Sequence, residues 1–588
     1  MRVGSREHRR LLAVARGEEP PDLLVRGGTV ANVYSGELLR ADVAASGGCI
    51  AYVGQSPPPP GPDTRTVEAG GRIVAPGYIE AHTHPWVLYD PVSLAGVAAA
   101  LGTTTVVADT LFFHLQMGPE RLAWLLDDLR ELPVNYLWVA RLISQSSFPG
   151  ERRLFSPEAA GDLLAREDVV GTAEITRWPA LASGDGHLLE GIARARQANK
   201  VADGHTGGAS EGRLPALVAA GITADHEAIS AQEVLSRLRL GLWTMLRHSS
   251  LRPDLPELLR AVTEEGVSTR RLILTTDGSS PEHIAEHGLV DGLLRIAVER
   301  GVDPMQALRM VTLNPATWMR RDHELGGLAP GRRADILLLP DLSSFRPETV
   351  ICGGRVVAEG GNLLAPLPSL DWEGYGARPG FDPGLPLEDP RLYPPRAAGP
   401  GEATPVIELV SAVITGLREE RLPAGDGLVR LDGSPGDLLY AALVDRGGGY
   451  VSRALLSGFA GEALEGLAST YNTTTQLLVI GRDPRAMGRA ASRVREMGGG
   501  IALAAGGGIA FELPLPVCGM MAPRPFAEMV EENRRLSREL RSRGYRFHDI
   551  LYTLLFLTCD FLPAFRLTPR GLLEVKSGRV LVPSGPPL

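Results

Sequence analysis

The chain has 588 residues, of which 44% are hydrophobic and 22% are charged, and its formal net charge is -9. This mixture excludes a fibrous or largely disordered protein, and the acidic balance excludes a general electrostatic attraction to nucleic acid or anionic membranes. At about 150 residues per domain, the length allows several domains.

Cysteine usage and the first residues bear on the cellular compartment. The four cysteines are far apart and have no paired metal spacing, which is typical of core cysteines in a reducing compartment. The N-terminus has no apolar run of signal-peptide length, and no uncharged stretch is long enough to span a membrane. We therefore expect a cytoplasmic protein that binds neither membrane nor nucleic acid.

Two distant segments read as short β-strands separated by glycine, proline and aspartate turns. The first covers residues 22–74, and the second, at 333–361, has the same pattern of short apolar runs between turn residues. We expect the first segment, within residues 1–75, to pair with the second, within 325–370, to form one small β-sandwich.

The segment between them, residues 76–324, alternates short apolar runs with helical patterns. A strand at 103–109 precedes a helix at 119–132, and a strand at 169–175 precedes a helix at 186–200. After a strand at 271–278 we expect one helix over 281–301. The repeated units predict a (β/α)8 TIM-like barrel with its chemistry at the C-terminal ends of the strands, although a doubly wound open sheet shares the alternation.

The last third of the chain differs in composition. Residues 371–405 are so rich in proline and glycine that they predict an interdomain linker. Residues 406–588 mix strand-like runs with amphipathic helical stretches such as 525–545, which indicates a separate C-terminal α/β domain.

Metal-ligand side chains stand at the ends of five predicted strands. "EAHTH" places two histidines on one face of a strand, because residues i and i+2 point the same way. Each motif alone has an ordinary alternative, such as a core histidine, a salt-bridged carboxylate or a turn-capping aspartate. Together they offer imidazole and carboxylate ligands that suit zinc, manganese or iron: His82, His84, Glu174, His205, His226, Glu227 and Asp277.

This series of strand-end motifs resembles the amidohydrolase superfamily, and within it the chain is similar to adenine deaminases from end to end. The resemblance implies a two-metal centre of manganese or iron, with zinc as the alternative, and proton transfer by Asp277, Glu227 and Glu174. The implied ligands are His82, His84, Glu174, His205, His226 and Asp277. The matching segments include "GTTTVVAD", "AAGITADHEA", "VDPMQALRMVTLNPA", "LAPGRRADILLL" and "FELPLPVCGMM".

Several segments depart from the family pattern beside the conserved ligands. Pro85 and Trp86 follow the histidine pair, and "TLF" follows "VVAD". "ITRWP" directly follows Glu174, and "TYNTTTQ" at 470–476 replaces a histidine-rich segment. Removing polar contacts to a base changes its recognition by orders of magnitude. We expect the replacements to include the substrate-pocket residues, namely Trp86, Phe112, Arg177 and Trp178.

The resemblance implies a metal-dependent hydrolytic deaminase that converts adenine or a related aminopurine and water to the oxo base and ammonia. Two alternatives stay open: an amidohydrolase of another cyclic amidine or amide, and an inactive metabolite-binding homologue. The resemblance also implies a role in purine metabolism and a homo-oligomer, a dimer or larger.

Overall fold

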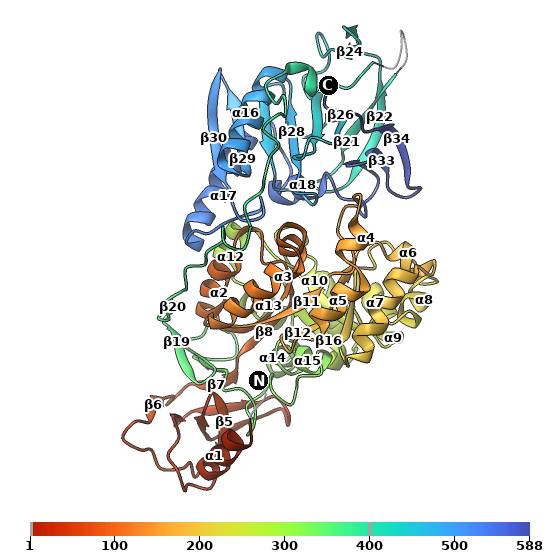
Figure 1. Cartoon of the computed structure of the whole chain (residues 1–588). Helices are drawn as coiled ribbons and strands as arrows, with labels where there is room; N and C mark the ends of the chain where they lie inside the picture. The colour runs from red at the N-terminus through yellow and green to blue at the C-terminus, as the bar shows by residue number, and fades with distance from the viewer. Residues whose placement is uncertain (1–3, 398–402) are drawn as a thin grey trace.

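The computed structural model describes residues 4–397 and 403–588 and has three parts in a row (Figure 1). A β-rich domain built around the N-terminal segment lies at one end, a barrel lies in the middle, and the C-terminal domain lies at the other end. The barrel therefore presents one mouth to the C-terminal domain.

The barrel is a sheet of eight parallel strands within the described residues, ordered along the sheet as along the chain. Between its first and last strands, Thr275 Oγ1 and the backbone N–H of Asp277 donate to the carbonyl of His82 at 2.7 and 3.2 Å. The predicted (β/α)8 barrel is confirmed. Its strands are β8 (Tyr78–Thr83), β10 (Thr103–Asp109), β11 (Asn135–Ala140), β12 (Val169–Ile175), β13 (Val201–Gly204), β14 (Ala224–Asp225), β15 (Trp243–Arg247) and β16 (Leu272–Thr275).

Local sequence signals begin and end the surrounding helices. α2 (Pro91–Ala100) starts with a capping box between Asp90 and Ser93, and α7 (Gly186–Gln197) is capped by the Asp185 carboxylate. The prediction of a single helix over 281–301 is wrong. Gly288 adopts φ 86° and ends α12 (Pro281–His287), and the chain starts again as α13 (Val290–Glu299).

The two β-rich segments meet in one domain. β7 (Ile73–Pro76) pairs in parallel with β2 (Thr29–Asn32) on one side and antiparallel with β17 (Ile336–Leu339) on the other. A four-stranded sheet that includes β1 (Leu23–Arg26) packs against this sheet through a shared apolar core. The segments pair as expected, while the domain boundaries that we drew stay predictions.

The C-terminal domain is built on a mixed sheet that includes β21 (Thr404–Leu409), β25 (Leu439–Val444), β26 (Val451–Ser457) and β28 (Leu477–Gly481). Helix α16 (Pro484–Met497) packs on this sheet, and α17 (Phe526–Arg541) packs against α12 of the barrel. β31 (Met521–Ala522) pairs with β9 (Leu88–Tyr89), directly after the histidine pair of the barrel. The C-terminal domain is therefore joined to the barrel mouth by backbone hydrogen bonds.

Residues 371–397 of the predicted linker contain little regular structure apart from η3 (Pro390–Leu392), yet Tyr375, Leu387 and Tyr393 are buried. Residues 398–402 of that prediction lie outside the described residues. The four cysteines are buried and free of disulfides. In the described part of the chain, no helix combines the length and the apolar character that crossing a membrane requires.

Candidate metal centre

The six predicted ligands come together where the barrel strands end. His82 Nε2 and His84 Nε2 lie 3.1 and 3.3 Å from Asp277 Oδ1. On the other side, Glu174 Oε2 lies 2.7 Å from His205 Nδ1 and 3.4 Å from His226 Nε2. Strands far apart in sequence thus deliver their side chains to one point, as parallel strands do at their carboxyl ends.

These residues form overlapping groups whose ligand atoms lie within 4.8 Å of one another. The groups are His82 with His84 and Asp277, His205 with His226 and Glu227, His82 with Glu174 and His226, and His84 with Asp109 and Glu174.

The donor set fits a divalent metal. The Nδ1 atom of His82 is 2.7 Å from Asp203 Oδ2, which orients the ring and leaves Nε2 for a metal. Nε2 is buried and makes no hydrogen bond to the described residues. Buried polar atoms normally have partners, so an imidazole aimed at other imidazoles and carboxylates marks a cation site.

Two buried arginines enter the centre, and sequence reasoning missed both. Arg141, which follows β11 and is fully buried, donates from Nη2 to Glu174 Oε1 at 2.9 Å and binds Asp109 through two further contacts from Nε at 2.9 and 3.0 Å. Arg247 donates from Nη1 to Glu227 Oε1 and Asp277 Oδ2, both at 2.6 Å. Each guanidinium therefore holds a pair of carboxylates in place.

The arginines also set the protonation of the carboxylates. Burial alone would raise the pKa of Glu174, but His205 and Arg141 hold that pKa well below its ordinary value. Burial likewise opposes ionisation of Glu227, yet Arg247 and His205 lower its pKa to about 2. The pKa of Asp277 is also well below normal, because Arg247 outweighs burial. All three carboxylates are thus ionised at neutral pH.

Three further polar residues support the ligands. Gln145 Nε2 donates to Glu174 Oε1 at 3.0 Å, and Asp203 orients His82. Glu80, two residues before His82 on the same strand, accepts from the hydroxyl of Thr276 at 2.7 Å. Alternation along the strand could have identified Glu80 and Asp203, since each lies two residues before a ligand histidine. Nothing in the local sequence singles out Gln145.

The four predicted substrate residues separate into two pairs. The ring of Trp86 lies against that of His84 in a tilted arrangement with centroids 4.6 Å apart, and Phe112 meets Trp86 edge to face at 4.5 Å. Arg177 instead pairs with Glu151 and lies 3.7 Å from Asp560, and Trp178 donates to the carbonyl of Gly207. Trp86 and Phe112 therefore lie beside the proposed metal ligands. Arg177 and Trp178 instead contact loops around the barrel mouth.

A segment of the C-terminal domain lies over the centre. The ring of Phe561 meets the His205 ring edge to face at 5.2 Å, and the Tyr552 hydroxyl donates to the carbonyl of Gly278 at 2.9 Å. The backbone N–H of Asp560 donates to the carbonyl of Gln145 at 3.1 Å. The barrel and the C-terminal domain together thus enclose the metal ligands.

Residues 73–357 match the sequence model of the Amidohydrolase family, and residues 412–579 match that of the Adenine deaminase C-terminal domain. The barrel and its cluster of histidines and carboxylates therefore define a protein of the amidohydrolase class.

Relatives that match along the whole chain identify the family within this class. Adenine deaminase of Rubrobacter xylanophilus is 36% identical over 582 residues, which cover 96% of this chain and 95% of the relative. Adenine deaminase of Paracoccus denitrificans is 33% identical over 579 residues, which cover 96% of each chain. The chain belongs to the adenine deaminase family.

Proposed function

We propose that this protein is a metal-dependent hydrolytic deaminase of adenine or a related aminopurine. The observation that carries the proposal is the convergence of four histidines and four carboxylates at one barrel mouth in a chain with full-length relatives named adenine deaminase. The products would be the oxo base and ammonia.

In this proposal the metal centre is held by His82, His84, Glu174, His205, His226 and Asp277. We assign two divalent ions to this donor set, whose nitrogen and oxygen ligands suit manganese or iron, with zinc as the alternative. A divalent metal bound there would lower the pKa of water towards about 7 and so supply a nucleophile at neutral pH.

Carboxylate side chains of the protein then accept and return protons. Asp277 Oδ1 faces His82 and His84 while Oδ2 is held by Arg247, so one oxygen stays directed at the reacting centre. We assign Asp277 as the proton acceptor that later returns the proton to departing ammonia. Glu174 and Glu227 are also held ionised, so we assign Glu227 as an acceptor for a substrate N–H group, while Glu174 remains a metal ligand.

One observation favours a second candidate function, hydrolysis of another cyclic amidine or amide. The apolar ring of Trp86 lies against His84 and that of Phe112 lies against Trp86, and the indole Nε1 of Trp86 is buried without a hydrogen-bond partner in the described residues. A single indole donor would select for a ring acceptor such as a carbonyl oxygen, which cyclic amides carry.

Ammonia release from a panel of aminopurines, measured beside metal content on the same sample, tests the proposal. We expect release from adenine or a close analogue by metal-loaded protein. Full metal content with turnover of cyclic amides alone would support the second function, and no turnover of either class would favour an inactive metabolite-binding homologue. A place in purine metabolism, a cytoplasmic location and a homo-oligomeric state are part of the same proposal.

A further inference from the structure

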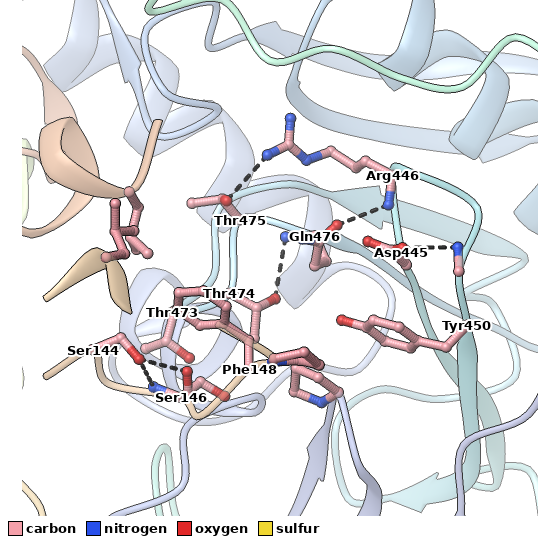
Figure 2. A pocket seen from close by; sticks show the side chains of 15 residues that line it. Ser144, Ser146, Phe148, Asp445, Arg446, Tyr450, Thr473, Thr474, Thr475 and Gln476 are labelled. Atoms are coloured by element: carbon pink, nitrogen blue, oxygen red, sulfur yellow. Dashed lines mark hydrogen bonds between the residues drawn. The ribbon is translucent and has the colours of Figure 1, made fainter. Parts of the chain in front are cut away.

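A cavity of about 510 Å³ lies between the barrel and the C-terminal domain (Figure 2). The barrel contributes Ser144, Ser146 and Phe148, and the C-terminal domain contributes the β25–β26 turn, residues 445–450, and the loop 473–476. Its volume falls within the range of about 300–1,000 Å³ that is usual for small-molecule sites.

The bent segment Ser144 to Ser146 lies between the cavity and the proposed metal centre. Ser144 and Ser146 line the cavity, whereas Gln145 between them turns the other way and donates to Glu174 Oε1 at 3.0 Å. The cavity is thus a second chamber, one residue away from a metal ligand.

One wall of the chamber carries the guanidinium of Arg446, which makes no salt bridge to a carboxylate of the described residues, although the charge of Asp445 acts on it. Arg446 makes hydrogen bonds at 3.2 Å to the carbonyl of Gly380 and to the hydroxyl of Thr475, and its Nε atom is buried without an acceptor among the described residues. Burial lowers the pKa of Arg446 to about 10. A half-buried cation of this kind is stabilised by an anionic ligand.

The loop beside Arg446 is strained. Thr475 has φ 55°, which β-branched residues rarely adopt, and its hydroxyl accepts from Arg446 (Figure 2). Gln476 is also fixed, because its Oε1 accepts from the backbone N–H of Arg446 at 2.8 Å, so its amide NH2 remains to donate elsewhere. Such strain clusters at ligand sites, where the surrounding structure maintains it.

The rest of the wall suits a planar base with an amino group. Figure 2 shows the Tyr450 hydroxyl directed at the space between Gln476 and Phe148. Asp445 uses Oδ2 to accept from the backbone N–H of Gly449 at 2.8 Å, which leaves Oδ1 as an acceptor. An aromatic ring, an acceptor for an exocyclic amine and a cation for a phosphate therefore line the same space.

We propose that this interdomain cavity is a binding site for a purine nucleoside monophosphate with an exocyclic amine, separate from the metal centre. Arg446 and the hydroxyl of Thr475 contact the phosphate, Asp445 accepts from the amine, and Phe148 and Tyr450 contact the base. This site goes beyond the proposed deaminase function and does not depend on it.

Isothermal titration of the metal-loaded full-length protein with AMP tests the proposal, with adenosine, IMP and inorganic phosphate as parallel titrants. We expect AMP to bind most tightly, adenosine at least about tenfold more weakly because it lacks the phosphate, and IMP more weakly than AMP because it lacks the amine.

Two variants test separately what the phosphate and the exocyclic amine contribute to binding. Arg446→Met should weaken AMP about tenfold or more and leave adenosine unchanged, whereas Asp445→Asn should remove the preference for AMP over IMP. His82→Ala, which removes a metal ligand on the far side of Gln145, should bind AMP like the unchanged protein. Thermal melts of each variant establish that it is folded.

The proposal is overturned if AMP gives no heat or melting shift, or if folded Arg446→Met binds AMP undiminished. Loss of AMP binding in His82→Ala would also overturn it, because the nucleotide would then occupy the metal centre. A failure of adenine turnover alone leaves these outcomes unaffected, so the two proposals fail separately.

Discussion

At the scale of single residues, Arg141 is the side chain on which the metal centre most depends for its arrangement before a metal binds. It is fully buried and joins Asp109 of β10 to Glu174 of β12, two carboxylates on the strands that flank β11. Removing one partner of a buried ion pair leaves an uncompensated charge.

Arg141→Met should therefore lower the free energy of unfolding of the metal-free protein by about 3–5 kcal/mol. Urea unfolding in the presence of a chelator measures the change. Arg177→Met is the matched control, since Arg177 also pairs with buried carboxylates but lies away from the ligands; an equal loss in both variants would mean that Arg141 has no special role.

Asp203 orients the imidazole of His82 without being one of the proposed ligands. Asp203→Asn should weaken metal affinity by about 10–100-fold, because an amide neither fixes the tautomer nor raises ligand basicity as a carboxylate does. Competition with a fluorescent chelator measures the affinity. Asp168→Asn, which alters a partly buried ion-paired carboxylate outside the centre, should leave it unchanged.

At the scale of elements, helix α3 (Leu111–Asp128) places a histidine side chain in the hydrophobic core. Its His114 is fully buried against Phe155, and burial lowers the pKa of His114 to about 4. The unfolded chain has a histidine pKa of about 6.5, so it binds the proton first as the pH falls. Stability that is fully present above pH 6.5 is then lost progressively down to about pH 4.

His114→Phe should reduce the loss of unfolding free energy between pH 6.5 and 4 by up to about 3 kcal/mol. Denaturant unfolding at a series of pH values measures it. His187→Phe, at a partly buried histidine on another barrel helix, serves as the control. An unchanged slope in His114→Phe would contradict the assignment.

Comparison of the elements with the sequence shows what local patterns can predict. The gathering of the strand-end histidines and carboxylates was predictable because apolar runs followed by such residues mark the mouth of a barrel. The break between α12 and α13 was missed, since glycine inside an apolar periodicity ends a helix only when it takes a positive φ. Arg141 and Gln145 were not predictable, because the sequence does not show which carboxylates a buried arginine or amide meets.

At the scale of the whole molecule, the metal centre and the interdomain cavity both depend on the contact between two domains. Phe561 of the C-terminal domain rests against His205. The cavity could not be inferred from the sequence, because its walls are separated along the chain and become neighbours only when the domains pack.

Phe561→Ala should uncover the His205 side of the centre and speed metal loss to excess chelator several-fold. The time course of metal release measures this effect. Phe547→Ala removes an aromatic ring from the same domain that packs on Tyr545 rather than on a ligand, so its release rate should match that of the unchanged protein.

The pairing of the barrel mouth with the C-terminal domain also determines when the site can form during synthesis. The hydroxyl of Ser146 donates to the carbonyl of Thr558, 412 positions later in the chain. A ribosome delivers the barrel long before that partner, so the nascent barrel exposes its mouth, with Trp86 and Phe112 nearby, until residue 558 has been synthesised. Chaperone dependence and aggregation of this protein should therefore be greatest during the last part of elongation.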